Sequence, residues 1–99
     1  MPTFVLVRHA KAGRSPGVPD LDRALADRGR SDAALIGAFL AGALPHPRAL
    51  ISSPARRARE TAAIVSAAAG WRSALVTDDR LYGGSVADLL AVLAEQRAD

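Results

Sequence analysis

The sequence predicts an α/β protein, a three-layer sandwich on a mostly parallel sheet with the order β-α-β-α-β-α. Two observations support this class. Short runs of β-forming apolar residues alternate with longer segments in which apolar residues recur at helical spacing. The first run, Phe4 to Val7, is continuously apolar, as expected for a strand that is buried on both faces. No linker or repeat divides the chain, so we expect residues 1–99 to form a single domain.

The first helix is expected from about Asp27 to Ala43, after a loop rich in glycine, proline and aspartate. Prolines at positions 45 and 47 cannot continue the helix and therefore end it. Residues 49–52 follow as a second short strand. The apolar positions that give this helix its spacing are Ala33, Ile36, Gly37, Leu40 and Leu44.

A second helix is expected to start with Ser53 as N-cap and Pro54 at the first helical position, and to run to about residue 69. Gly70 is well placed to end it. Residues 73–77 are a third strand candidate. Ser85 and Asp88 have the spacing of a capping box for a last helix, whose apolar face would carry Val86, Leu89, Leu90 and Leu93.

The composition narrows the class of protein. There is no cysteine, which excludes disulfides, a thiolate nucleophile and a zinc knuckle. The start has neither the basic region nor the long apolar run of a signal peptide or membrane span, so we expect a cytoplasmic protein without membrane contact. The net charge is +3, and Lys11 is the only lysine among 13 basic residues. No aromatic residues are interleaved with the arginines, which argues against nucleic-acid binding.

Two chemically distinctive stretches follow predicted strands. Arg8 and His9 come directly after the first strand, and Arg56 and Arg57 lie where the second strand gives way to a helix. Ligands of open α/β sheets bind beyond the carboxyl ends of the strands, where both stretches would meet. The start of a helix carries a partial positive charge, so arginines there are unfavourable unless an anion compensates them. Phosphate is a suitable anion, because guanidinium groups bind it bidentately. A neutral imidazole beside such a pocket is a competent nucleophile toward phosphorus.

Three motifs in order, "LVRHAKA", "LADRGRSDA" and "SPARRARETA", resemble the histidine phosphatase superfamily, which also contains the phosphoglycerate mutases. The "RHAKA" form and the small size are most similar to its SixA-like phosphohistidine phosphatase branch. The resemblance covers roughly residues 3 to 90. It implies a phosphoglycerate mutase-like fold and a phosphatase that uses no cofactor and no metal. Its substrate would be a phosphorylated protein carrying phosphohistidine, or a small phosphorylated metabolite.

The resemblance also implies roles for individual residues. His9 would be the nucleophile that is transiently phosphorylated, while Arg8 and Arg57 would bind the phosphoryl group. Lys11 could line the mouth of the pocket, and Arg23 could reach the substrate, although exposed surface positions are the commoner case for both. Arg56 falls on a variable position of the motif.

Two further expectations concern the helices that carry these motifs. The i,i+4 spacing of Arg56 and Glu60 favours an ion pair on the helix surface. Thr61, one turn after the second arginine of the motif, is expected to pack beneath the pocket without taking part in chemistry. Ala26 stands where the family usually has a threonine, so Asp27 is expected to substitute as the cap of the first helix.

The chain departs from the family pattern in its catalytic groups. The family has a second catalytic histidine after a later strand, whereas this chain has only His9 and His46, and His46 lies at the wrong end of the second strand. We therefore expect the N-terminal portion of a histidine phosphatase domain, with slow turnover. An exposed sheet edge could then pair with another copy. Asp78 and Asp79 lie too early in the chain to match the family's proton donor, and the absence of such a donor favours phosphohistidine over an alcohol phosphomonoester.

Two other functions stay open at this point. The chain could be a non-catalytic, phosphate-binding remnant that keeps the arginines and His9. It could also be a small-molecule phosphomonoesterase. An arginine-rich nucleic-acid binder is the least favoured, because neither a recognition helix nor a stacking platform is present.

Overall fold

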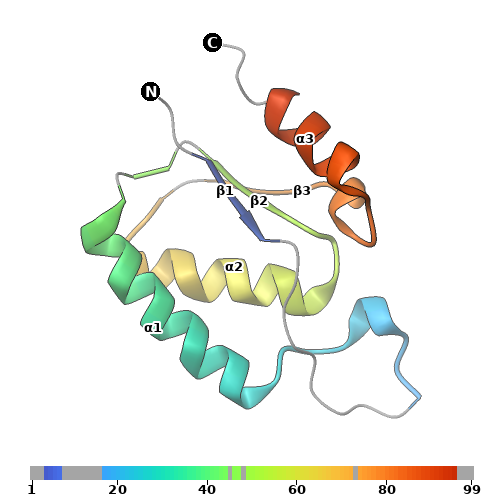
Figure 1. The fold of residues 1–99 in the computed structure, drawn as a ribbon. Helices are drawn as coiled ribbons and strands as arrows, with labels where there is room; N and C mark the ends of the chain where they lie inside the picture. The colour runs from blue at the N-terminus through green and yellow to red at the C-terminus, as the bar shows by residue number, and fades with distance from the viewer. Residues whose placement is uncertain (1–3, 8–16, 45, 48, 73, 96–99) are drawn as a thin grey trace.

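A computed structural model describes residues 4–7, 17–44, 46–47, 49–72 and 74–95 of the chain. Strands and helices alternate in the described parts, which confirms the predicted β-α-β-α-β-α order (Figure 1). Two short 3-10 helices, η1 and η2, precede α1 and α3. The elements are β1 Phe4–Val7, η1 Asp20–Asp22, α1 Asp27–Ala43, β2 Ala49–Ser52, α2 Arg56–Ala69, β3 Leu75–Thr77, η2 Asp79–Leu81 and α3 Val86–Glu95.

The three described strands form one parallel sheet in the order β1-β2-β3, so β2 is central. Val7 at the end of β1 pairs with Ser52 at the end of β2, and Ser52 pairs with Thr77 at the end of β3. The carboxyl ends of all three strands therefore lie at one edge of the sheet. The chain leaves β2 at this edge and enters α2 within four residues, which brings the first turn of α2 to the same edge.

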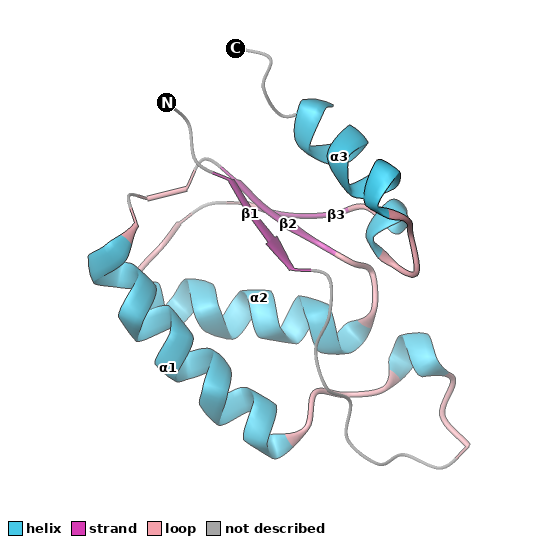
Figure 2. Ribbon diagram, viewed as in Figure 1, coloured by secondary structure: helices cyan, strands magenta, loops and turns pink. Residues whose placement is uncertain are grey.

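Helices cover both faces of the sheet, which confirms the three-layer architecture (Figure 2). Helices α1 and α2 lie on one face and α3 lies on the other. Consecutive residues of β2 point to opposite faces of the sheet. Leu50 accordingly packs with Ala33, Val65 and Trp71, whereas Ile51 belongs to a separate buried cluster. That second cluster is completed by Leu81 and Val92, with Leu89 packed against it.

Helices α1 and α2 approach each other closely at Gly37. A Cβ atom built on Gly37 would lie 2.5 Å from the carbonyl oxygen of Val65 and 2.7 Å from the Cβ of Ala68. Ala33 and Ala62, both buried, are also small residues on these two helices. The alanine-rich composition therefore serves a close helix pair, in which backbones approach because the side chains are short.

Three of the five predicted helix-end signals are confirmed, the first being the end of α1 at Ala43, ahead of Pro47. Gly70 ends α2 with φ 74°, a left-handed conformation that glycine adopts without strain. Ser85 and Asp88 form the expected capping box, because the Asp88 amide donates to Ser85 Oγ and the Ser85 amide donates to Asp88 Oδ2. The cap proposed at Asp27 was wrong: Asp27 is already helical and Ala26 occupies the N-cap without a side-chain bond.

The start of α2 also differs from the prediction. The helix begins at Arg56 with Ala55 as N-cap, two residues later than expected. The Ser53 hydroxyl accepts a hydrogen bond from the Ala55 amide at 3.2 Å, so it closes a short turn rather than capping a helix that starts at Pro54.

The burial of the helix faces was predicted only in part. Ala33 and Gly37 of α1 are buried as expected, but Ile36 and the C-cap residue Leu44 are exposed. In α3, Val92 is the buried residue, whereas three members of the predicted apolar face are exposed. These three are Val86, Leu90 and Leu93. Within the described parts of the chain, none of the helices combines the length and the apolarity needed to cross a bilayer.

Candidate functional site

The link between β2 and α2 is held rigidly at the carboxyl edge of the sheet. Ser52 and Ser53 are both fully buried. The Ser52 hydroxyl donates to the Ser53 carbonyl oxygen at 2.7 Å, and the Ser52 carbonyl oxygen accepts from the Asp78 amide at 2.9 Å. The Ser53 hydroxyl accepts from the Ala55 amide, so both buried hydroxyls have a partner and help to fix the start of α2.

Arg57 lies in this first turn, and its side chain is only 17% exposed. Its Nη1 donates to the backbone oxygen of Asp20 at 2.8 Å, and its Nη2 donates to Asp20 Oδ2 at 3.1 Å. The hydroxyl of Tyr82, which follows η2, donates to the same Oδ2 atom. We call these three residues, Asp20, Arg57 and Tyr82, the Asp20 junction. It joins η1, α2 and the segment after η2, which are far apart in the sequence.

The electrostatics of the Asp20 junction keep its carboxylate ionised. The hydrogen bond from Tyr82 and, after it, the hydrogen bond from Arg57 hold the pKa of Asp20 below its ordinary value. The hydrogen bond to this carboxylate in turn raises the pKa of Tyr82. At neutral pH the junction therefore contains a carboxylate, a guanidinium and a neutral phenol.

A second cluster ties the entry of α1 to α2 through Glu60. The carboxylate of Glu60 accepts from the Leu25 amide and from Arg30 Nη2, both at 2.8 Å. Arg56 Nε lies 3.6 Å from Glu60 Oε2, which confirms the predicted i,i+4 pair. The bond from the Leu25 amide is the largest of the effects that lower the pKa of Glu60, followed by that from Arg30.

The two clusters change the interpretation of the arginines at the start of α2. The sequence suggested that an anionic ligand compensates the arginines of this turn, although the pair of Arg56 with Glu60 was already expected. In the structure, carboxylates of the chain itself, Glu60 and Asp20, lie against them. Thr61 donates its hydroxyl to the Arg57 carbonyl oxygen at 2.8 Å, a local helix bond consistent with a packing role.

The remaining predicted site residues are placed as follows. Arg8, His9 and Lys11 lie outside the described residues. Arg23 is half-buried, and its Nε lies 3.5 Å from the Val18 carbonyl oxygen within the same loop, so it does not join the Asp20 junction.

Asp78, the first carboxylate after β3, has a structural role. Asp78 caps η2 and forms an ion pair of 2.7 Å with Arg80, which also binds Glu95 of α3 at 2.6 Å. The hydrogen bond from Arg80 lowers the pKa of Asp78. An ionised, paired carboxylate is a poor proton donor, so the structure agrees with the doubt about Asp78.

His46 lies at the opposite edge of the sheet, as expected. Its Nε2 accepts a hydrogen bond from the amide of Arg72, which precedes β3. His46 thus connects the turns at the amino ends of β2 and β3.

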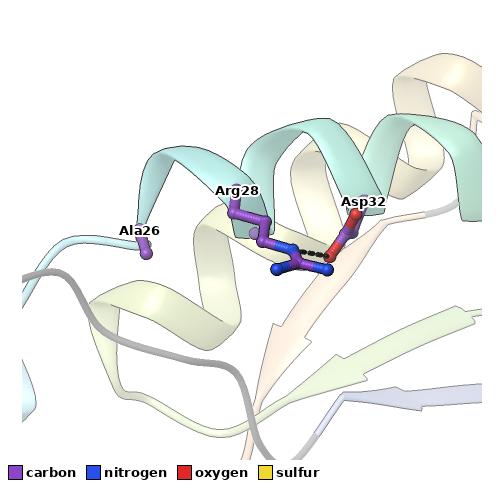
Figure 3. A pocket seen from close by; sticks show the side chains of 4 residues that line it. Ala26, Arg28 and Asp32 are labelled. Carbon is purple, nitrogen blue, oxygen red and sulfur yellow. Dashed lines mark ion pairs between the residues drawn. The ribbon is translucent and has the colours of Figure 1, made fainter.

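A shallow hollow of about 380 Å³ lies at the start of α1, and of the predicted site residues that the structure describes, neither Arg23 nor Arg57 lines it (Figure 3). Arg28 and Asp32 pair with each other across it at 3.9 Å, and Arg28 is 92% exposed. An open hollow whose charges are already paired with each other offers little to a ligand. The described residues that line it are Ala26, Arg28, Gly29 and Asp32.

Sequence reasoning missed Asp20 and Tyr82. Asp20 and Arg57 are 37 residues apart in the sequence, and Asp20 and Tyr82 are 62 residues apart. No periodicity or motif spacing connects positions so far apart, and only the folded sheet edge brings them together.

The fold belongs to a known class of protein. Residues 4–88 match the family model of the histidine phosphatase superfamily (branch 1). The chain therefore belongs to the histidine phosphatase superfamily, and its fold is phosphoglycerate mutase-like.

Similar solved structures indicate which branch of the superfamily the chain resembles. The SixA of Nakamurella multipartitia, a provisionally assigned phosphohistidine phosphatase, is 40% identical with a TM-score of 0.79, over 99% of this chain and 54% of that one. The SixA of Agrobacterium tumefaciens, assigned in the same way, is 33% identical with a TM-score of 0.82, over 97% of this chain and 63% of that one. These matches support the SixA-like branch.

The curated relatives are uncharacterized proteins of Mycobacterium tuberculosis. Rv1276c of strain H37Rv and MT1313 of strain CDC 1551 are each 42% identical over 79 residues, which is 80% of this chain and 48% of theirs. The chain thus spans about half the length of the curated relatives it matches.

Proposed function

We propose that this chain supplies the phosphate-binding and nucleophilic part of a SixA-like phosphohistidine phosphatase. The observation that carries the proposal is the position of Arg57, largely buried at the carboxyl edge of a parallel sheet in a chain of the histidine phosphatase superfamily. Ligands bind at this edge in open α/β sheets, and a guanidinium is the group best shaped for a phosphoryl oxygen pair.

The nucleophile in this proposal is His9. Val7, the last residue of β1, pairs with Ser52 at the edge from which α2 starts, and Arg8 and His9 follow Val7 directly in the sequence. An imidazole nitrogen of His9 attacks phosphorus, and the bond from phosphorus to the substrate's imidazole nitrogen breaks. The leaving imidazole takes up a proton. Water then attacks phospho-His9 and releases phosphate, while Arg8 and Arg57 bind the phosphoryl oxygens.

The proposed substrate is a phosphorylated protein carrying phosphohistidine. Imidazole is a better leaving group than an alkoxide, so its departure needs less help from a proton donor. This fits a site in which Asp78 is ionised and already paired with Arg80. Lys11 and Arg23 are the residues proposed to extend the substrate-binding surface.

A labelling experiment tests the nucleophile. The protein is incubated with radiolabelled phosphoramidate, and acid-labile, base-stable protein label is counted. We expect label on the wild type and on His46→Ala, and none on His9→Ala. The two variants are matched because the chain has only these two histidines. Label that persists on His9→Ala would contradict the proposal, whereas phosphate binding without any label would favour the non-catalytic phosphate-binding alternative.

A binding experiment tests Arg57. Inorganic phosphate is titrated and followed by NMR shifts of the backbone amides. Arg57→Ala should weaken phosphate binding by about 10- to 100-fold, because it removes a charged hydrogen-bonding group. Arg59→Ala is the matched control: Arg59 is an exposed arginine of the same helix that donates to the Pro54 carbonyl oxygen at 3.0 Å. Equal weakening by the two variants would show that only overall charge matters.

A further inference from the structure

The contact of Asp20 with Arg57 has the form in which a guanidinium binds an anion. Two terminal nitrogens of Arg57 donate to two oxygens of one residue, and one of these oxygens belongs to an ionised carboxylate. A phosphoryl group would present a similar pair of oxygens to the same two nitrogens. Asp20 and a bound phosphate would therefore use the same donors.

We propose that Asp20 is an internal anion that occupies Arg57 in the ligand-free protein, and that phosphate binds by displacing it and releasing η1. This inference rests on the proposed role of Arg57 in binding phosphate. The new element is an autoinhibitory contact: Arg57 can bind either Asp20 of η1 or a phosphoryl group, but not both.

The way η1 is held fits a displaceable segment. Residues 17–22 are all exposed, and η1 buries none of its residues. The 3-10 helix is closed by local backbone bonds, from Asp22 to Pro19 and from Arg23 to Asp20. Among the described residues, the side-chain bonds that tie η1 to the rest of the fold are those of the Asp20 junction. Release of Asp20 would therefore expose no apolar core.

Charge repulsion makes Asp20 and phosphate compete for Arg57 even if there is space for both anions. The lowered pKa of Asp20 keeps a full negative charge at the guanidinium near neutral pH. A phosphoryl group carries up to two negative charges, and like charges a few ångströms apart repel each other. Removing the charge of Asp20 should therefore strengthen phosphate binding. If Asp20 instead served to position Arg57 for phosphate, its removal would weaken binding.

The test compares four variants in the phosphate titration by NMR. Asp20→Asn should bind inorganic phosphate about fivefold more tightly than the wild type, the factor that corresponds to one unit-charge interaction at about 4 Å in water. Asp22→Asn is the matched control, because Asp22 is an exposed acid of the same turn with which no described side chain pairs. It should change the affinity less than twofold.

The mechanism also predicts a dependence on Arg57. On an Arg57→Ala background, Asp20→Asn should no longer tighten phosphate binding, because the competition takes place at that guanidinium. Unchanged or weaker binding by Asp20→Asn, equal tightening by Asp22→Asn, or tightening that persists without Arg57 would each overturn the inference. An Arg57→Ala variant that binds phosphate like the wild type would instead refute the proposed function itself.

Discussion

The close crossing of α1 and α2 predicts opposite effects for the same substitution at two glycines of one helix. At Gly37, an added methyl group would lie 2.5 Å from the Val65 carbonyl oxygen and 2.7 Å from the Ala68 Cβ. Both neighbours belong to α2, and one is backbone, so the two helices must move apart to accept it. At Gly42, later in α1, no atom of another described segment lies within 4 Å of the added methyl group.

The magnitudes follow from two opposing effects. Replacing glycine by alanine inside a helix stabilises by about 1 kcal/mol, because alanine restricts the unfolded chain and favours the helix. Overpacking of a close contact costs about 1–3 kcal/mol. Gly42→Ala should therefore raise the free energy of unfolding by about 1 kcal/mol, whereas Gly37→Ala should lower it by up to about 2 kcal/mol. Urea denaturation followed by Trp71 fluorescence measures both. Stabilisation by Gly37→Ala equal to that by Gly42→Ala would refute the close crossing.

Three further predictions concern polar contacts. Glu60→Gln should lower the free energy of unfolding by about 1–3 kcal/mol at pH 7. Since the fold lowers the pKa of Glu60, its contribution is complete above the ordinary value of 4.5 and is lost as the pH falls through the lowered pKa, so urea denaturation of the two proteins should converge in acid. Ser85→Ala should cost about 1 kcal/mol by the same assay, because it removes the cap of α3; no loss would mean that the capping box is not formed. Asp20→Asn should lower the pKa of Tyr82 toward its ordinary value, which an absorbance titration of this single tyrosine would show, and an unchanged value would contradict the Asp20 junction.

The features that were predicted from sequence are those encoded within a few residues. Strand β2, the bounds of α1, the glycine stop at Gly70 and the capping box at Ser85 each depend on local backbone geometry and short-range hydrogen bonds. The Arg56–Glu60 pair depends only on the helical repeat. These features can therefore be predicted from the sequence without knowledge of the fold.

The features that were missed depend on what lies opposite in space. Val92 rather than Leu90 is the buried residue of α3, because burial is decided by the position of Ile51 and Leu81 and not by hydrophobicity alone. In the same way, Phe39 of α1 is 73% exposed although it is strongly apolar. The helical period identifies an apolar stripe, but it does not fix which edge of the stripe meets the sheet.

In the candidate site, too, the locally encoded residue was predicted and its partners from distant segments were not. Its arginine was predicted from the sequence, because Arg57 lies in a motif and at the start of a helix. Its partners Asp20 and Tyr82 were not, because each comes from a different loop and only the parallel sheet brings the loops to one edge. The carboxylate that neutralises Arg57 was therefore found in the structure alone.

A crystal structure of the protein with vanadate, a mimic of phosphoryl transfer, tests the central claim most directly. The account predicts vanadate bonded to an imidazole nitrogen of His9, with the guanidinium groups of Arg8 and Arg57 within hydrogen-bonding distance of its oxygens and Asp20 withdrawn from Arg57. Vanadate bound elsewhere, or density that leaves Arg57 paired only with Asp20 at saturating concentration, would contradict it.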